Sequence, residues 1–267
     1  MKIEVLVSTM YRKDFDLIKK MNIKGDAVII NQTDKDGYAE ADTEKGKAKF
    51  ISTTDRGLSV SRNAAIKAAS GEVCLIADDD LRYADDYIEG VKKAYLELPR
   101  ADIIVFDVLS LNPERPERDF GNRIFKLGFK RALQVSSYRI SFRPEKIAEK
   151  NITLNPVFGA GARFSMGEEN IFMRECLKRG LKAYYYPYRI AEVTHEQSTW
   201  FAGYTDKYFR DLGAVYYKLF GGAYLLFALW FLLTKRRLYS TWMKGRKAIG
   251  YMREGKREYE TVIKAER

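Results

Sequence analysis

The sequence is poor in the residues that hold structural metals and disulfide frameworks. Its 267 residues include two cysteines and one histidine. A thiolate zinc site or a disulfide-stapled secreted domain needs more of these residues. Cys74 lies in an apolar run and Cys176 in a helical pattern, so both are expected in the core of a protein from a reducing, cytosolic compartment.

Long apolar runs are also scarce. The opening residues 2–7 are too few and too charged for a secretory leader, so they predict a first β-strand. The longest run, Leu219–Leu233, would form a helix of roughly 22 Å at about 1.5 Å per residue, shorter than the ~30 Å hydrocarbon core of a bilayer. A full transmembrane span is therefore not expected.

The excess of positive charge is confined to the C-terminal region. The net charge is +11, and fourteen of the 47 Lys/Arg but five of the 36 Asp/Glu occur from Lys207 onward. A nucleic-acid-binding protein would carry its basic residues along a groove across the domain. We therefore expect no nucleic-acid partner.

The segment after the apolar run predicts a membrane-associating tail. Residues 235–257 hold nine Lys/Arg against the single acid Glu254. Apolar and aromatic residues are interspersed among them, namely Leu238, Tyr239, Trp242, Met243, Ile249, Tyr251 and Met252. This pattern is typical of an interfacial helix on anionic lipid, peripheral at the inner face of the cell membrane. The alternative is a helical hairpin that packs on the catalytic domain or on a second subunit of a homo-oligomer.

Apolar runs alternate with helical patterns in residues 1–110. Strands are expected at Ile3–Val7, Ala27–Ile30, Phe50–Ile51, Val73–Ala77 and Ile103–Phe106, and helices around Leu17–Met21, Val60–Ala69 and Tyr87–Leu98. This alternation predicts an α/β fold with a mostly parallel sheet and helices on both faces. Ligands of such sheets bind outside the carboxyl ends of the strands.

The composition divides the rest of the chain. Residues 111–205 begin with a charged loop and then predict a short strand at Tyr138–Phe142 and a helix at Glu145–Lys150. We expect a catalytic domain at 1–205, with a nucleotide-binding half at 1–110 and an acceptor half at 111–205. A helical appendage would follow at 206–267.

Three carboxylates follow the predicted fourth strand. Asp78, Asp79 and Asp80 would repel one another at a strand end unless a cation were bound. Their hard oxygen ligands suit Mg²⁺ or Mn²⁺, bridging to a substrate diphosphate. The alternative is an acidic turn that caps the next helix.

The segment before this triplet carries two arginines. Residues 56–80 begin Arg-Gly-Leu-Ser-Val-Ser-Arg-Asn-Ala-Ala and end Ala-Asp-Asp-Asp, and the donors of Arg56 and Arg62 could reach a phosphate. This run resembles the donor half of family-2 inverting glycosyltransferases of the GT-A (Rossmann-like) fold. The resemblance implies a nucleotide-diphosphate sugar, an Asp-x-Asp motif and a divalent metal.

The resemblance also implies roles by position. Asp78 and Asp79 would lie near the ribose and diphosphate, Asp80 would hold the metal, and Arg56 and Arg62 would help to fix the nucleotide. Ser8 and Thr9, after the first strand, would line the base pocket. The family often has an acidic residue after its second strand, where this sequence has Asn31 and Gln32.

A second segment, residues 158–172, resembles the family's Gly-Glu-Asp motif. It reads Phe-Gly-Ala-Gly-Ala-Arg-Phe-Ser-Met-Gly-Glu-Glu-Asn-Ile-Phe. The resemblance makes Glu169 the general base, beside Glu168. A positioned carboxylate can take the proton of a sugar hydroxyl as that hydroxyl attacks. The alternative is that both acids merely complement the dipole of a helix's first turn.

Two later residues complete the candidate site. His195 follows an apparent strand, and the resemblance gives it a role as a metal ligand, although a lone histidine can equally be structural. Trp200, with the neighbouring Phe201 and Tyr204, could form an acceptor-stacking wall or belong to the core.

Together these features predict a Mn²⁺- or Mg²⁺-dependent inverting glycosyltransferase. It would move a sugar from a nucleotide-diphosphate donor, with UDP favoured, to a hydroxyl of a glycan or lipid-linked acceptor in cell-surface polysaccharide synthesis. A catalytically silent GT-A domain that serves as a membrane-associated sugar-binding scaffold is the main alternative. A nucleotidyltransferase is another, and it would release pyrophosphate instead of a nucleoside diphosphate.

Overall fold

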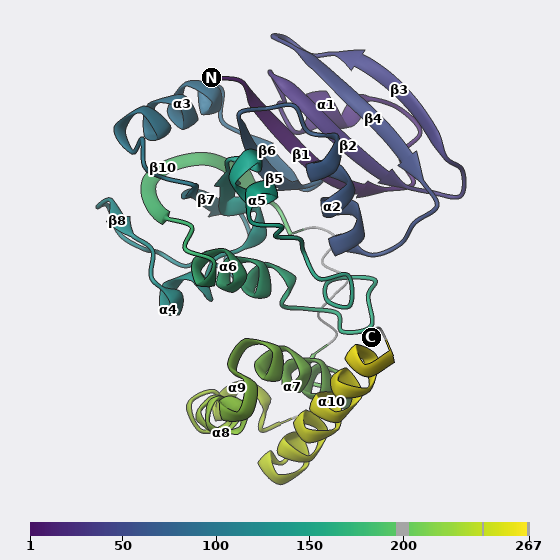
Figure 1. The fold of residues 1–267 in the computed structure, drawn as a ribbon, viewed down its shortest axis with the longest axis vertical. Coiled ribbons are helices and arrows are strands. Elements are labelled where there is room, and N and C mark those ends of the chain that lie inside the picture. Colours follow the sequence, from purple (N-terminus) through teal and green to yellow (C-terminus); the bar gives the residue numbers. More distant parts are fainter. Residues whose placement is uncertain (196–202, 242, 266–267) are drawn as a thin grey trace.

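A computed structural model describes residues 1–195, 203–241 and 243–265 (Figure 1). Within these residues ten strands form one sheet: β1 (Ile3–Met10), β2 (Asp26–Gln32), β3 (Gly37–Asp42), β4 (Lys47–Thr53), β5 (Val73–Asp78), β6 (Leu81–Tyr83), β7 (Ile103–Ser110), β8 (Phe125–Lys126), β9 (Ile140–Phe142) and β10 (Ala183–Val193). The helices are α1 (Asp16–Lys20), α2 (Leu58–Ala68), α3 (Tyr87–Glu97), α4 (Phe129–Ala132), α5 (Pro144–Glu149), α6 (Glu168–Lys178), α7 (Asp206–Phe220), α8 (Tyr224–Thr234), α9 (Arg236–Tyr239) and α10 (Gly245–Ala265), with 3₁₀ turns η1 (Ser137–Arg139) and η2 (Gly221–Ala223).

The strand order is β3-β4-β2-β1-β5-β9-β7-β10-β6, and β8 pairs with β10. Strands β4, β2, β1, β5, β7 and β10 run in one direction, whereas β3, β6, β8 and β9 run against them. The predicted α/β fold is therefore confirmed. All the predicted strands exist, although the segment predicted at Tyr138–Phe142 begins as the 3₁₀ turn η1 and is extended only in β9.

The sheet has a hydrophobic core on each face. Along β1, Val5 and Val7 point into one core and Leu6 points into the other, as the two-residue period of a strand requires. Helices α1 and α3 cover the first core, and α2, α5 and α6 cover the second. Both cysteines are free and buried in the second core, which confirms their predicted placement. Because both faces are covered, only the strand ends can open a site to solvent.

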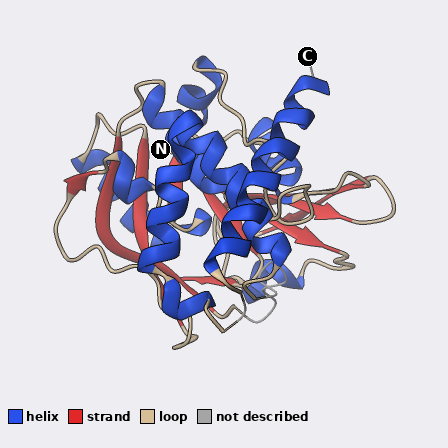
Figure 2. Ribbon diagram, turned by 90° about the horizontal axis from the view of Figure 1, so that it is seen from below, coloured by secondary structure: helices blue, strands red, loops and turns tan. Residues whose placement is uncertain are grey.

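The carboxyl ends of the central strands face the C-terminal helices. In register, Ser8 at the end of β1 lies beside Asp78 at the end of β5, and Thr9 lies beside Asn31 of β2. Figures 1 and 2 show the tail helices α7, α8 and α10 gathered across this end of the molecule. The polar strand ends therefore lie on the side of the sheet where the tail begins.

The apolar run near the C-terminus does not form one helix, which corrects our expectation. Taken together, α7, η2 and α8 (Asp206–Thr234) are long and apolar enough, by length and composition alone, to cross a membrane. The chain changes direction at Gly221, whose φ is +57°. As a result, Phe227 of α8 stacks on Phe220 of α7, with ring centroids 3.5 Å apart. The two arms, α7 and α8, have 15 and 11 residues, and each is shorter than the ~30 Å apolar layer at about 1.5 Å per residue.

Helix α10 packs on α7 with its apolar side, whereas membrane association of the tail stays a prediction. Met252, one of the predicted membrane anchors, is fully buried, and Ile249 and Tyr251 pack against the same tail core. The alternative of a packed helical tail therefore describes α10. Two glycines permit the close contact: an added Cβ would meet the backbone O of Met252 at 2.1 Å from Gly213, and the backbone O of Arg210 at 1.8 Å from Gly255.

We predict that Gly255→Ala destabilises the protein by about 1–3 kcal/mol, because the added methyl group collides with the backbone of α7 and must push the two helices apart. Chemical denaturation followed by far-UV circular dichroism measures the change.

Gly250→Ala is the matched control, since Gly250 lies in the same helix with open space around it. There the substitution should stabilise by about 0.5–1 kcal/mol through helix propensity. Equal effects at the two positions would contradict the proposed packing.

Candidate functional site

The acidic triplet forms a strand end and a turn. Asp78 is the last residue of β5, Asp79 and Asp80 make the turn, and β6 follows at once. The next helix, α3, begins at Tyr87 with Asp86 at its N-cap. The alternative that the triplet caps a helix is therefore wrong.

Arg62 joins this triplet to the second motif. The guanidinium, on α2, is buried and donates to Asp78 Oδ1 at 2.7 Å, to Glu168 Oε1 at 2.9 Å and to Ser137 Oγ at 2.8 Å. Burial opposes its charge, but the two carboxylates outweigh that effect and hold the pKa of Arg62 above its ordinary value. Two segments that lie far apart in the chain thus form one site.

The same bonds define the role of Arg62. Its side chain is 3% exposed, and both terminal nitrogens are used within the protein. The predicted contact with a nucleotide would require it to release a carboxylate. In this structure Arg62 positions the acids instead, while a direct contact with the nucleotide stays a prediction.

Thr9 and Asp79 meet at the mouth of the site, together with Arg12. Thr9 Oγ1 donates to Asp79 Oδ2 at 2.5 Å, and Arg12 donates to both side chains, at 3.1 Å to Thr9 and 2.9 Å to Asp79. Ser8 is buried beneath and accepts a bond from Ser61 at 2.8 Å. Sequence reasoning missed Arg12, although its place just beyond a polar strand end was a usable signal.

Asn31 and Gln32 brace the loops around the site. Asn31 Oδ1 accepts from the backbone N–H of Arg12 at 2.9 Å, and its Nδ2 donates to the Arg12 carbonyl at 3.0 Å. Gln32 Oε1 accepts from the backbone N–H of Gly57 at 2.8 Å. Both side chains are buried, so they shape the loops after β1 and before α2. Their predicted contact with the nucleotide stays a prediction.

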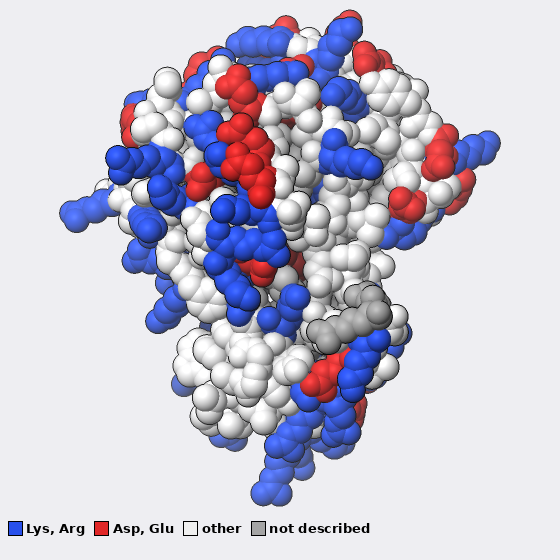
Figure 3. Space-filling view, viewed as in Figure 1, with Lys and Arg blue, Asp and Glu red and all other residues white. Residues whose placement is uncertain are grey.

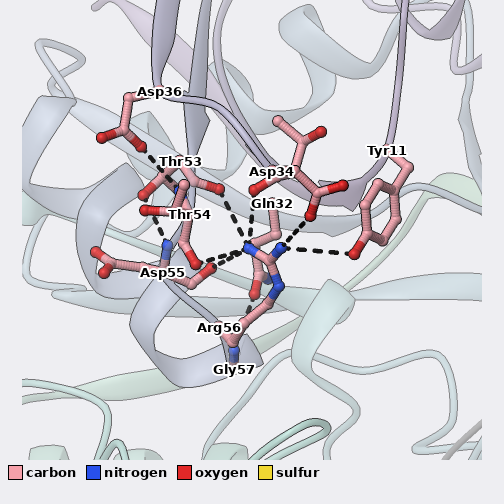
Figure 4. A network of polar contacts seen from close by, with 10 residues as sticks. Tyr11, Gln32, Asp34, Asp36, Thr53, Thr54, Asp55, Arg56 and Gly57 are labelled. Atoms are coloured by element: carbon pink, nitrogen blue, oxygen red, sulfur yellow. Dashed lines mark hydrogen bonds and ion pairs between the residues drawn. The ribbon is translucent and has the colours of Figure 1, made fainter.

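Arg56 organises the outer rim of the site (Figure 4). It donates to the carbonyls of Thr33 and Thr54, at 3.0 and 2.7 Å, and pairs with Asp34 at 3.0 Å. Its guanidinium also lies 5.8 Å from the ring centroid of Tyr11. Asp34, in the loop after β2, was not among the predicted site residues.

Asp80 and His195 each offer a side-chain atom that could bind a metal ion. Among the described residues, neither Asp80 Oδ1 nor His195 Nε2 has a hydrogen-bond partner, although both atoms are buried. Burial, with repulsion from Asp78 and Asp79, raises the pKa of Asp80 to about 6, while burial lowers the pKa of His195 and favours its neutral form. Each of these buried atoms could therefore take a metal ion as its partner.

The backbone brings these two residues together. Thr194 N–H donates to the Asp80 carbonyl at 3.3 Å, and His195 then adopts a left-handed φ of 57°, which is uncommon outside glycine. No group of three His, Cys, Asp or Glu side chains in the described ranges forms a ready-made metal cluster. Oxygen atoms of the substrate and water would have to complete the coordination.

The two glutamates of the second motif differ in their surroundings. Both lie in the first turn of α6, after Gly167 at a left-handed φ of 85°. Glu168 is buried against Arg62, whereas Glu169 is partly exposed. Burial, followed by repulsion from Glu168, raises the pKa of Glu169 above its ordinary 4.5. Of the two acids, Glu169 is thus the one suited to proton transfer.

The tail holds the turn before α6 in place. Asp211 of α7 is buried and accepts from Ser165 N–H at 2.9 Å, Ser165 Oγ at 2.6 Å and Lys207 Nζ at 2.6 Å. A Cβ at Gly167 would lie 2.8 Å from Val215 of the same helix. Sequence reasoning did not predict this support of the motif.

Trp200 and Phe201, predicted to contact an acceptor, lie outside the described residues. Tyr204 packs on Tyr208 of α7 with ring centroids 5.0 Å apart, within the tail core. For Tyr204 the alternative of a core residue therefore describes the structure.

We predict that Arg62→Met destabilises the protein by about 3–5 kcal/mol, because it leaves the buried Glu168 and the partly buried Asp78 without their common partner. Urea denaturation measures the loss. Arg12→Met is the control: its pair with Asp79 is partly exposed and should contribute about 1 kcal/mol or less. Adding Glu168→Gln to Arg62→Met should restore part of the stability, and a further loss would contradict this account.

Comparisons with known proteins identify the family and the fold. The model of glycosyl transferase family 2 matches residues 26–172. A comparison with curated protein sequences finds no significant match.

Crystal structures of S. aureus TarS 1-349 share the fold. The form in complex with UDP is 12% identical, with a TM-score of 0.64, and the match covers 96% of this chain and 81% of that one. A second crystal structure of TarS 1-349 has a TM-score of 0.62 at the same identity and coverage. The form in complex with UDP-GlcNAc is 13% identical, with a TM-score of 0.58, covering 82% of this chain and 66% of that one.

Proposed function

Because the chain belongs to glycosyl transferase family 2, we propose that it is a metal-dependent, inverting glycosyltransferase that transfers a sugar from a nucleotide-diphosphate donor to a hydroxyl of a glycan or lipid-linked acceptor. The main support for this proposal is that Arg62 forms hydrogen-bonded ion pairs with both Asp78 and Glu168. It brings the donor-side carboxylates and the acidic turn of α6 to one place.

Glu169 is the general base of the proposed reaction. A sugar hydroxyl is a poor nucleophile, and a carboxylate that takes its proton makes attack on the anomeric carbon possible. The raised pKa of Glu169 makes it a stronger base than an ordinary glutamate. Glu168 stays paired with Arg62 and orients the turn from which Glu169 projects.

Mn²⁺ or Mg²⁺ is the proposed cofactor, held by Asp80 and His195. When bound, such an ion stabilises the negative charge of a departing diphosphate. The support for this assignment is that both residues offer a buried donor atom without a hydrogen bond in the described structure.

A UDP-sugar is the proposed donor, used in polysaccharide biosynthesis. The support is that solved structures of the same fold hold UDP and UDP-GlcNAc. The rim formed by Tyr11, Asp34 and Arg56 offers an aromatic ring, a carboxylate and a cation next to the strand ends. These groups could stack on and hydrogen-bond a uracil base.

Thermal unfolding with Mn²⁺ and each of UDP, GDP, CDP, dTDP and ADP tests the proposal. A ligand at 100 times its Kd stabilises a protein by about 2.7 kcal/mol. We expect a Mn²⁺-dependent rise in Tm with UDP, and release of a nucleoside diphosphate during turnover. The absence of any shift in folded protein would favour the silent scaffold, and release of pyrophosphate would favour a nucleotidyltransferase.

We predict that Asp80→Ala and Glu169→Gln both abolish transfer, by different routes. Loss of Asp80 should remove the Mn²⁺-dependent part of UDP binding, whereas Glu169→Gln should leave that binding nearly intact and eliminate turnover. Calorimetric titration with UDP, run with and without Mn²⁺, separates the two. Glu175→Gln, at the far end of the same helix, is the control and should retain activity. Equal loss of binding in both variants would contradict these roles.

We predict that kcat/KM rises with pH over a range above the ordinary pKa of glutamate, because the base must be deprotonated and its pKa is raised. Glu168→Gln removes the neighbouring negative charge and should move this rise to lower pH. A rise centred at the ordinary value in the wild type would contradict the assignment.

The same shift has a consequence for stability. A carboxyl whose pKa is raised by folding stabilises the folded state fully below its unfolded pKa, and this contribution is lost as the pH rises through the folded pKa. Glu169→Gln should therefore remove that part of the pH dependence of the unfolding free energy.

A further inference from the structure

The largest group of exposed apolar side chains lies on α8 and α9. Leu226, Leu229, Trp230 and Leu233 on α8 are 69%, 49%, 58% and 78% exposed, and Leu238 on α9 is 50% exposed. The α8 residues follow the spacing i, i+3, i+4 and i+7, which places them on one face of the helix. The opposite face, with Ala228, Phe231 and Leu232, is buried in the tail core.

Cations follow this apolar face at once. Lys235, Arg236 and Arg237 continue from the end of α8 and are exposed, and so are three basic residues at the start of α10, namely Lys244, Arg246 and Lys247. No acidic residue occurs between Asp211 and Glu254. In Figure 3 the surface over α8 and α9, at the lower left, is largely white, and blue side chains border it below.

We propose that this face of α8, with its basic border, docks on an anionic lipid bilayer. Its apolar side chains would enter the boundary between headgroups and acyl chains, and the cations would contact lipid phosphates. The anionic lipids of the cytoplasmic leaflet match this charge, so the protein is peripheral at the inner face of the membrane.

Charge complementarity favours a bilayer over a second copy of the chain. A two-fold contact pairs a surface with itself. Because the segment between Asp211 and Glu254 holds no acid, such a contact would set the cations of one copy against those of the other. A lipid surface supplies the missing negative charge.

Docking also places the candidate site near the bilayer. Helix α7 lies between α8 and the turn that carries Glu169: Phe220 of α7 stacks on Phe227 of α8, while Asp211 and Val215 contact that turn. The interaction with lipid itself needs neither donor nor metal, so it stands apart from the proposed reaction.

Co-sedimentation of the full chain with vesicles tests the proposal. We expect binding to an equal mixture of phosphatidylcholine and phosphatidylglycerol, weaker binding at high salt, and little binding to phosphatidylcholine alone. The double variant Leu229→Glu, Trp230→Glu should lose binding. Arg236→Ala, Arg237→Ala should weaken it about fivefold for each charge removed.

Leu96→Glu is the matched control, because Leu96 is an exposed leucine of α3, far from the tail face, and should bind like the wild type. Thermal unfolding with UDP and Mn²⁺ checks that each variant is folded, and an unchanged nucleotide response beside lost vesicle binding separates this proposal from the proposed function. Equal binding to both vesicle types, or vesicle binding retained by the Leu229→Glu, Trp230→Glu variant, would overturn it. A concentration-dependent dimer in light scattering that this variant abolishes would overturn it in favour of a second copy.

Discussion

Arg62 carries a positive charge into the interior, and the geometry of the candidate site depends on how that charge is balanced. An unpaired buried guanidinium is costly, so a carboxylate from β5 and another from α6 must both approach it. These two elements are distant in sequence. The ion network therefore fixes the spacing between the acidic triplet and the proposed base more firmly than the sheet alone could.

A second set of contacts holds the turn before Glu169, the proposed general base, against the tail. The turn before α6 contacts α7 through Asp211 and Val215. Helix α7 in turn packs on α10, where Gly213 lies against Met252 and Gly255 against Arg210. The tail is thus part of the framework of the site. One apolar face of the tail forms the core between its helices, and another, on α8, is exposed.

The elements that depend on a local sequence pattern could be predicted from the sequence. Buried strands appear as apolar runs in the sequence, and the resemblance singled out the two segments of Asp78 and Glu168, which Arg62 joins by hydrogen bonds. Strand β3 was missed because it is an exposed, largely polar edge with no buried face. The roles of Arg12 and Asp34 depend on contacts between loops. The packing of α10 on α7 could not be predicted, because a basic amphipathic helix shows the same periodicity whether its apolar side meets lipid or another helix.

The hydrogen bonds between Asp211 and Ser165 link the tail to the turn before α6. Any rotation of the tail away from the sheet must break these bonds and open the contact of Val215 with Gly167. The orientation of the tail and the conformation of the turn ahead of Glu169 are therefore coupled through these contacts. If α8 docks on a bilayer as proposed, holding α8 in place would also restrict the positions open to the carboxylate of Glu169, the proposed general base.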